Sequence, residues 1–329
     1  MERGRAVADS DPHHVSDADG IGGLAMRRTA MVAVASLLVA GLAVTGLRIA
    51  TARQAEAATA VVELHAVHGA SFVPALQGKR PLFILAIGSD ARPGQRIDRQ
   101  RADSIHIIGI DTVHHRASIL GFPRDSWVRI PGHGTDKINT AMTIGGPSLV
   151  ARTLESMTGI RIDFWALTSF PGLVSMVNGI GGLTVFVPQR LHDRFSGAFL
   201  RKGRRHLKGP QALAFARDRH DFLNGDISRS KNQGTLMVAA LARLHQVFAT
   251  KPSDLLAWVA VGWRNIRTDL SPQIVLDLAL LATQIPVRNV NNVVVPSSTG
   301  NVGAQSVVFI RGGAQRLYAD MRRDGVIGH

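Results

Sequence analysis

The stretches LFILAIG (82–88), SIHIIGI (104–110) and ASILGF (117–122) decide the fold of this chain. Each is short and almost wholly apolar, which predicts a buried strand. Only the six residues 111–116 join the second stretch to the third. Because a parallel pair needs a longer crossover, these two strands should be antiparallel.

Helices and further strands surround these three segments. Helices are predicted over 147–157, 170–177 (with Ser169 as N-cap), 210–216, 228–248, 255–263 and 274–285, and strands over 183–187, 293–295 and 306–310. The ranges 147–157 and 228–248 follow the 3.6-residue period of an apolar stripe, while a proline in the first turn marks the helix over 210–216. This mixture predicts an α/β fold, a layered α/β/α domain with a central mixed sheet.

The composition excludes several classes of protein. Hydrophobic residues make up 45% and charged residues 19% of the 329 positions, which excludes a disordered chain. Cysteine is absent, so disulfides, thiolate zinc sites and a cysteine nucleophile are excluded. The net charge is +14, and only six of the 38 basic residues are lysine. Arginine suits bidentate contacts with phosphate.

One segment near the N-terminus predicts a membrane anchor. Residues 29–47 contain no charged side chain, and a helix of that length spans about 28 Å, close to a bilayer's apolar thickness. Arg27 and Arg28 directly precede it. The positive-inside rule then places the N-terminus in the cytoplasm and the rest of a single-pass membrane protein outside the cell. Cleavage as a signal peptide, near Ala55–Ala58, is the alternative.

The anchor divides the rest of the chain into regions. We expect a disordered cytoplasmic tail over 1–28 and a juxtamembrane connector over 48–80, helical near 55–67. The extracytoplasmic catalytic domain should cover 81–311, followed by a C-terminal tail over 312–329.

Acidic residues flank the first two predicted strands. Asp90 follows the first strand and Asp103 precedes the second, so an antiparallel pair brings both carboxylates to one sheet edge. Arg124, after the third strand, should face Asp103. Two close carboxylates repel unless a cation lies between them, and Mg²⁺ with bound phosphates suits such oxygen ligands. Arg92 and Arg101 would contact those phosphates. Alternatively, the two aspartates simply cap turns and pair with arginine.

A second basic cluster surrounds the start of the long helix. Arg229 and Gln233 are four residues apart, so they share its inward face. Arg217 and Arg219 lie just before that helix, whose N-terminus favours an anion. An internal ion pair between Arg229 and Asp226 is the alternative reading.

Familiar catalytic motifs are missing from the sequence. There is no GxSxG elbow, no HExxH pair, and no GxGxxG or Walker loop. The sequence therefore does not predict a serine hydrolase, a zinc protease or a nucleotide-binding enzyme.

Several ordered segments together resemble the LytR-CpsA-Psr family of bacterial envelope proteins. They are GSDAR (88–92), RADS (101–104), FPRDSWVRIPGHGTDKIN (122–139), GG (145–146), GIGGLTV (179–185), HLKGPQALAFARDR (206–219) and GD…R…Q (225–233). The resemblance covers roughly residues 82–244 and also fits an anchored, outward-facing protein.

The resemblance implies a phosphotransferase that moves a glycopolymer from a polyprenyl pyrophosphate carrier to peptidoglycan, forming a phosphodiester link. It implies that Asp90 and Asp103 bind Mg²⁺ and act in catalysis with Arg124. The residues implied to hold the pyrophosphate are Arg92, Arg101, Arg124, Arg217, Arg219, Arg229 and Gln233, with Lys137 and Asn139 as weaker candidates. Apolar helices would wall a tunnel for the prenyl chain.

Three other functions remain open at this point. The protein could be a non-catalytic receptor or regulator that binds envelope polyanions, or a hydrolase of polyprenyl pyrophosphate. The net charge alone would also suit a nucleic-acid binder. Aromatic residues make up only 5% of the chain and the domain is expected outside the cell, so we expect no nucleic-acid partner.

Overall fold

The computed structural model describes residues 62–68, 73–250 and 266–328, which belong to one packed unit, Ala57–His329. The expected cytoplasmic tail (1–28), the membrane span (29–47) and the helix over 255–263 lie outside the described residues. Among the residues that are described, no helix combines the length and the apolar character needed to cross a bilayer.

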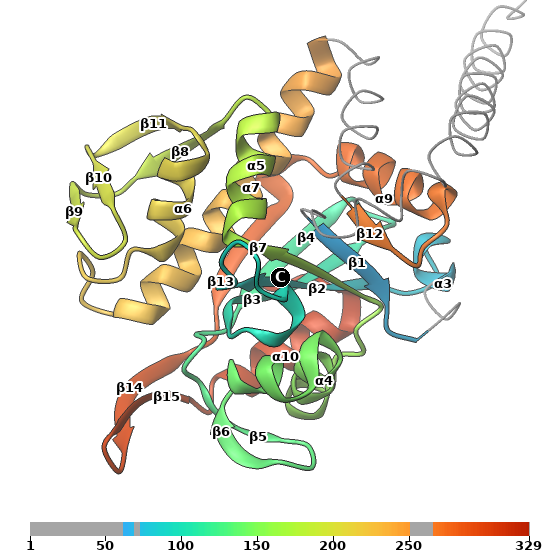
Figure 1. Cartoon of the computed structure of the whole chain (residues 1–329). Coiled ribbons are helices and arrows are strands. Elements are labelled where there is room, and N and C mark those ends of the chain that lie inside the picture. Colours follow the sequence, from blue (N-terminus) through green and yellow to red (C-terminus); the bar gives the residue numbers. More distant parts are fainter. Residues whose placement is uncertain (1–61, 69–72, 251–265, 329) are drawn as a thin grey trace, which may run out of the picture. The chain divides into compact units, whose positions relative to one another are not determined.

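Within the described chain, seven strands form a mixed sheet in the order β12-β1-β7-β2-β3-β4-β13 (Figure 1). The strands are β1 (Val62–Ala66), β2 (Leu82–Ser89), β3 (Ala102–Asp111), β4 (Arg116–Gly121), β7 (Phe164–Ser169), β12 (Ile266–Thr268) and β13 (Val290–Val294). Strands β2, β3 and β4 are antiparallel, while β7 runs parallel to β2 and β13 parallel to β4. The predicted antiparallel meander is confirmed.

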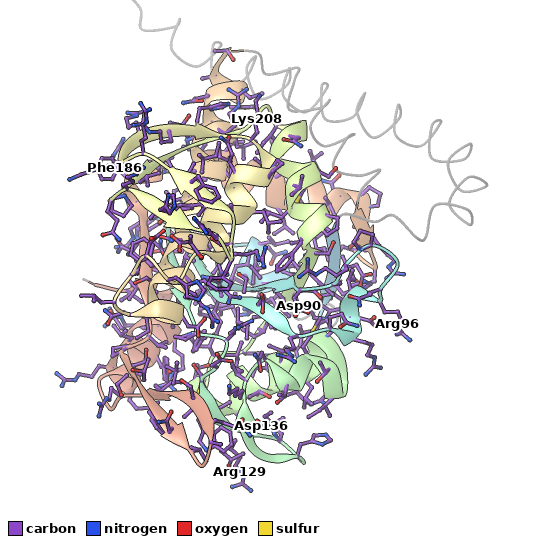
Figure 2. The ribbon with its side chains drawn as sticks, turned by 60° about the vertical axis from the view of Figure 1, so that its left-hand side comes forward. Asp90, Arg96, Arg129, Asp136, Phe186 and Lys208 are labelled. Carbon is purple, nitrogen blue, oxygen red and sulfur yellow. The ribbon has the colours of Figure 1, made fainter. Side chains whose placement is uncertain are left out.

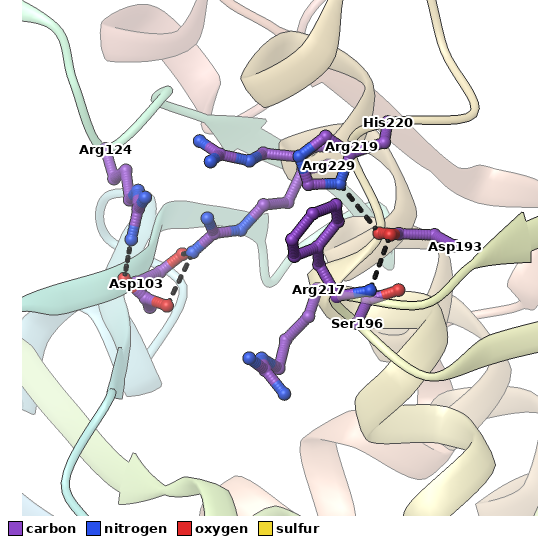
Figure 3. Close-up of a pocket in the computed structure, with 9 residues that line it drawn as sticks. Asp103, Arg124, Asp193, Ser196, Arg217, Arg219, His220 and Arg229 are labelled. Carbon is purple, nitrogen blue, oxygen red and sulfur yellow. Dashed lines mark hydrogen bonds and ion pairs between the residues drawn. The ribbon is translucent and has the colours of Figure 1, made fainter.

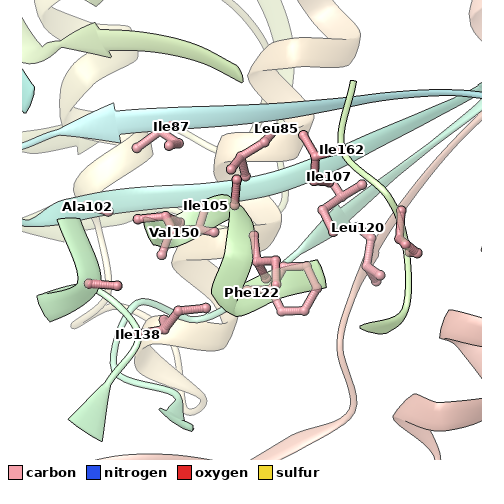
Figure 4. Packing of buried hydrophobic residues seen from close by; sticks show 14 of the residues in the cluster. Leu85, Ile87, Ala102, Ile105, Ile107, Leu120, Phe122, Ile138, Val150 and Ile162 are labelled. Atoms are coloured by element: carbon pink, nitrogen blue, oxygen red, sulfur yellow. The ribbon is translucent and has the colours of Figure 1, made fainter. Parts of the chain in front are cut away.

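Alternate residues of β2 enter two different hydrophobic clusters. Phe83, Leu85 and Ile87 pack with helices α4 (Thr140–Thr158) and α10 (Ala314–Asp324), and Figure 4 shows part of this cluster. Leu82 and Ile84 pack instead with helix α9 (Pro272–Gln284). Since successive side chains of a strand point to opposite faces, helices cover both faces of the sheet. The α/β fold with a central mixed sheet is therefore confirmed.

A side lobe follows strand β7. It contains α5 (Phe170–Gly179), β8 (Leu183–Val187), β9 (Leu191–Asp193), β10 (Ala198–Leu200), β11 (Gly203–Leu207) and α6 (Gly209–Arg217). Its strands form two antiparallel pairs, β8 with β11 and β9 with β10, over a separate hydrophobic cluster. Helix α7 (Gly225–Thr250) contacts β8 of the lobe and β3, β4 and β13 of the sheet. Leu236 and Ala239 of α7 belong to the cluster of the lobe and Leu241 packs on the cluster that contains α9, so this helix joins the lobe to the sheet.

The remaining elements are short. They are α3 (Val73–Leu76), η2 (Ile97–Arg99), η3 (Val287–Asn289), and the strand pairs β5 (Trp127–Ile130) with β6 (Gly134–Lys137) and β14 (Ser297–Val302) with β15 (Gln305–Ile310).

Local signals placed the start of one helix correctly and that of another too late in the chain. The Ser169 side chain accepts a hydrogen bond from the Gly172 N–H, so the predicted N-cap of α5 is confirmed. Helix α4 begins at Thr140, earlier than expected. Gly146, with φ 66°, interrupts its geometry directly before Pro147, so the predicted start at residue 147 marks a kink inside the helix.

Both expected ends of the domain need correction. The helix expected near 55–67 is wrong over Val62–Ala66, because these residues form β1 and pair antiparallel with β7. The expected tail over 312–329 contains α10, whose Tyr318 and Met321 are fully buried. Sheet pairing and core burial override the local composition in both places, and the packed unit extends beyond 81–311.

The buried face of α10 generates a stability prediction. Met321→Ala removes a fully buried side chain from the main cluster and should lower the free energy of unfolding by about 2–5 kcal/mol. Arg316→Ala, on the exposed side of the same helix, should change it by less than about 0.5 kcal/mol. Urea denaturation measures both variants. Equal, small effects would mean that α10 is a detached tail.

Candidate functional site

The two predicted acidic residues meet at one edge of the sheet. Strand β2 pairs with β3 up to Ser89, which lies opposite Ala102. Beyond it, the Asp90 N–H donates to the Arg101 carbonyl (3.1 Å), and the Arg101 N–H donates to Asp90 Oδ1 (3.1 Å). Burial, and then the nearby charge of Asp103, raise the pKa of Asp90 above its usual range. The expected approach of two carboxylates is therefore confirmed.

Asp103 lies between two guanidinium groups, as Figure 3 shows. Its Oδ1 is 2.5 Å from Arg124 Nη1 and its Oδ2 is 2.8 Å from Arg229 Nη2. Burial alone would raise the pKa of Asp103, but the charges and hydrogen bonds of Arg229 and Arg124 hold it below its usual value. Asp103 therefore remains ionised. The predicted contact between Arg124 and Asp103 is confirmed.

Gln233 fixes the start of α7 rather than lining a cavity. Its amide nitrogen donates to the carbonyls of Asp103 (3.0 Å) and Ala216 (3.2 Å). Arg229 Nη2 also donates to the Asp103 carbonyl (2.8 Å). Since both amide hydrogens of Gln233 are used by the backbone, its expected contact with pyrophosphate would require these bonds to break. Gln233 is therefore a positioning residue, which holds the start of α7 against the backbone of Asp103 and Ala216.

A second carboxylate, Asp226, lies behind the arginines. Its oxygens are 3.4 Å from Arg229 Nη1, 3.8 Å from Arg124 Nε and 3.9 Å from Arg219 Nη1. The alternative reading of Arg229, an internal pair with Asp226, is thus also present in the structure. Asp226 thus helps to orient three of the arginines, of which Arg124 and Arg229 also contact Asp103.

Lys137 and Asn139, the weaker candidates, reach a different carboxylate. Lys137 Nζ is 3.6 Å from Asp125 Oδ1, and Asn139 Nδ2 donates to the same oxygen (3.3 Å). Burial, and then the charge of Asp226, raise the pKa of Asp125. Both side chains support the loop that carries Arg124.

Four predicted arginines surround one cavity of about 400 Å³ (Figure 3). Its lining consists of Asp103, Arg124, Asp193, Phe195, Ser196, Arg217, Arg219, His220 and Arg229. The cavity lies between the sheet edge and the side lobe. With four arginines against two aspartates in its wall, it suits an anion that carries several charges, such as a diphosphate.

Phe170 forms the wall of a second, more apolar pocket of about 250 Å³. Its lining consists of Arg92, Pro93, Phe170, Pro171, Val174, Leu213 and Arg217. The guanidinium groups of Arg92 and Arg217 lie 5.6 Å and 5.1 Å from the centre of the Phe170 ring. Arg217 thus lines both cavities. The exposed Arg101 lines neither of them.

The side lobe supplies wall residues that the sequence did not suggest. Asp193 Oδ2 is 3.0 Å from His220 Nδ1, and the Phe195 N–H donates to Asp193 Oδ1 (2.8 Å). Burial would raise the pKa of Asp193, but hydrogen bonds from His220 and Ser196 hold it at about 2. These residues belong to a short hairpin that carries no motif. His220 directly follows Arg219, which the sequence did predict. This adjacency was the one sequence signal that could have identified a wall residue.

The carboxylates fit a metal ion only with help from a phosphate. Among the described residues, no group of three or more His, Cys, Asp or Glu side chains could hold a metal. Both oxygens of Asp103 already contact arginine, whereas Asp90 accepts one backbone N–H. Burial and then the charge of Asp103 raise the pKa of Asp90, and a cation beside this carboxylate would offset both effects. The two residues thus fit Mg²⁺ whose shell is completed by phosphate oxygens.

Comparison with known proteins identifies relatives of this chain. The family model described as the LytR_cpsA_psr family matches residues 44–318. The probable cell wall biosynthesis protein LcpB of Corynebacterium glutamicum is 34% identical over 184 residues, 52% of this chain and 43% of LcpB. The polyisoprenyl-teichoic acid–peptidoglycan teichoic acid transferase TagT of Bacillus subtilis is 30% identical over 202 residues, 59% of this chain and 62% of TagT. The matches span roughly half of each relative's length.

A solved structure of the family protein YwtF (TagT) with bound octaprenyl pyrophosphate has a similar fold. It superimposes with a TM-score of 0.58 at 21% identity, over 83% of this chain and 98% of that protein. This similarity concerns the fold, and the lipid is a property of that protein.

His106 lies beneath the site and was not identified from the sequence. It is fully buried on β3, with Nε2 3.0 Å from the Ser230 carbonyl and Nδ1 3.1 Å from Ser104 Oγ. A carbonyl only accepts, so Nε2 carries the proton and Nδ1 accepts from the serine hydroxyl. The neutral ring joins β3 to the first turns of α7. Burial lowers the pKa of His106 to about 4.

This buried histidine predicts an acid-sensitive stability. The unfolded chain takes up the proton near the ordinary pKa of 6.5 and the folded chain only near 4, so stability is complete above pH 6.5 and falls between those values. The loss should be about 3 kcal/mol. His106→Gln should remove this loss from unfolding curves measured across that pH range. The matched variant His133→Gln, in an exposed turn, should keep it. An unchanged pH profile in His106→Gln would contradict the assignment.

Proposed function

This chain belongs to the LytR-CpsA-Psr family, and we propose that it transfers a glycopolymer from a polyprenyl pyrophosphate carrier to peptidoglycan through a phosphodiester bond. The observation that carries the proposal is the convergence of Arg124, Arg217, Arg219 and Arg229 on one cavity beside Asp103. The name of the relative TagT, a teichoic acid transferase, supports the same class of reaction.

The four arginines divide into fixed and available cations. Arg124 and Arg229 are held by Asp103, and Arg229 is only 4% exposed. The side chain of Arg219 is 41% exposed, and its contact with Asp226 is long, at 3.9 Å. Arg217 stacks on Phe170. Arg217 and Arg219 are therefore the groups best placed to bind a diphosphate. Arg124 and Arg229 contribute to the positive electrostatic potential of the cavity.

The adjoining apolar pocket suits the first carbons of the prenyl chain. Phe170, Val174 and Leu213 offer apolar surface, and Arg217 lies at the junction with the charged cavity. A ligand with a diphosphate at one end and a hydrocarbon at the other matches this order. The longer tunnel expected from the sequence remains a prediction.

In the proposed reaction, a hydroxyl oxygen of the peptidoglycan sugar attacks the phosphorus attached to the glycopolymer. The bond from that phosphorus to the bridging oxygen breaks, and prenyl phosphate leaves. Arg217 and Arg219 stabilise the charge that develops on the phosphoryl oxygens and on the leaving group. The hydroxyl proton passes to solvent water as the new phosphorus–oxygen bond forms, because Asp90 and Asp103, as the proposed metal ligands, would be poor bases.

Mg²⁺ is the cofactor we propose, with Asp90 and Asp103 as its protein ligands. When bound, it would neutralise phosphate oxygens during the transfer. The membrane anchor predicted over 29–47 would hold the domain outside the cell, where both the lipid carrier and peptidoglycan are available.

Arg219 offers the sharpest test of the anion site. Arg219→Ala should lower kcat/KM for transfer about 100-fold, since one preorganised cation is removed from the developing charge. The unfolding temperature of this variant should stay close to that of the wild-type protein, because the Arg219 side chain is partly exposed and weakly paired. Arg152→Ala, an exposed arginine on α4, is the matched control and should retain full activity.

The same assay separates the alternatives when it is run with and without peptidoglycan. Transfer predicts a polymer–peptidoglycan product that depends on the acceptor. Release of the polymer at equal rates in both reactions would indicate a hydrolase. Binding of the lipid without turnover under any condition would indicate a receptor and contradict the proposal.

Metal dependence is a separate prediction. Chelation with EDTA should abolish transfer, and added Mg²⁺ should restore it. Asp90→Asn should lower turnover about 100-fold, and excess Mg²⁺ should not restore it. The substitution removes the carboxylate of the site that has the fewest protein partners and is most available to the metal. Glu155→Gln, a substitution remote from the cavity on α4, is the control. Full activity in EDTA would remove Mg²⁺ from the account.

A further inference from the structure

The strands of the side lobe carry an unusual concentration of positive charge. Residues 183–208 contain a single acidic residue, Asp193, which is buried and bonded to His220. Six exposed cations belong to the same stretch: Arg190, Arg194, Arg201, Lys202, Arg204 and Lys208. None of the six forms an ion pair with any residue that the structure describes. We call this surface the basic face.

Exposed aromatic rings accompany these charges. Phe186, 59% exposed, lies opposite Arg204 in the β8–β11 pair. Phe199, 57% exposed, lies opposite His192 in the β9–β10 pair, with ring centres 5.0 Å apart. Figure 2 shows Phe186 and Lys208 on this lobe, at the end of the domain away from Arg129. Large apolar side chains exposed beside unpaired cations indicate a binding surface rather than a merely solvated one.

The basic face begins at the wall of the charged cavity. The turn between β9 and β10 contributes Phe195 and Ser196 to the cavity lining. The Phe195 ring, 80% exposed, lies 4.8 Å from the ring of His220, another wall residue. A ligand fixed in the cavity would therefore leave it past Phe195 and reach the exposed sides of β9, β10 and β11.

The two cavities set the direction of the substrate. Arg217 is shared with the apolar pocket, which marks the prenyl side of the diphosphate. The lobe residues Asp193, Phe195 and Ser196 complete the lining of the charged cavity but are absent from the apolar pocket, so they mark the side on which the polymer begins. The glycopolymer, rather than the lipid, is thus the part of the substrate next to the basic face.

We propose that the basic face binds the glycopolymer along its length, through acidic groups on its repeating units. The proposal rests on the proposed function, because it extends the substrate of that site. Arginine and lysine would contact the acidic groups, and the apolar faces of sugar rings would pack on Phe186 and Phe199. A neutral glycan would leave these six cations without an anionic partner among the described residues.

The test measures binding of a lipid-free probe to the full-length protein in neutral detergent. The probe is a short, water-soluble poly(glycerol phosphate), and dextran is the neutral control. The triple variant R201S/K202S/R204S removes three charges from the basic face. The triple variant R129S/R152S/R316S removes three exposed arginines elsewhere and matches it in net charge.

The lobe variant should bind the polyanion at least about tenfold more weakly at low salt, and the difference should shrink as salt rises. The control variant should stay within about twofold of the unchanged protein. Equal losses in the two variants, or no loss in either, would overturn the proposal. Thermal unfolding of both variants checks that they are folded.

A parallel measurement separates the polymer from a lipid surface. Mixed micelles of phosphatidylglycerol in the same detergent replace the polymer, with phosphatidylcholine micelles as the neutral control. Loss of phosphatidylglycerol binding by the lobe variant, with polymer binding intact, would overturn the proposal in favour of a membrane contact. Neither probe is a substrate for transfer. The binding result can therefore be interpreted even if the protein does not catalyse the proposed reaction.

Discussion

The ionised Asp103, held between Arg124 and Arg229, is the interaction on which the site depends. Burying three charges is costly unless each has a close partner, so loss of any one would leave its partners uncompensated. Arg124 follows β4, Asp103 opens β3, and Arg229 lies on the first turns of α7. The triad therefore clamps the long helix to the sheet edge. Arg217, at the end of α6, and Arg219, between α6 and α7, are brought to the same edge.

This arrangement explains why so many arginines gather in one place. The aspartates fix some of them and leave others available. Asp103 and Asp226 orient Arg124 and Arg229, whereas Arg217 and Arg219 have only weak or aromatic partners among the described residues. A cavity that keeps excess positive charge when empty is prepared for an anion and needs little rearrangement when it binds. The neutral, buried His106 supports the floor without adding charge.

The sequence predicted those parts of the molecule that local patterns control. The three apolar stretches, the short connection between β3 and β4, and the cap at Ser169 were sufficient for the meander and for the pairing of Asp103 with Arg124. Features that depend on tertiary context were missed. Strand β1 needs β7 as a partner, and α10 becomes part of the core only because the sheet offers a face for Tyr318. The lobe residues at the cavity carry no motif, since their role comes from position alone.

A crystal structure of the protein with a short-chain prenyl pyrophosphate and Mg²⁺ would test the central claim most directly. We expect a diphosphate in the cavity, within hydrogen-bond distance of Arg217 and Arg219, with the prenyl carbons against Phe170. A diphosphate bound elsewhere on the domain, with the arginine cavity left to solvent, would contradict it.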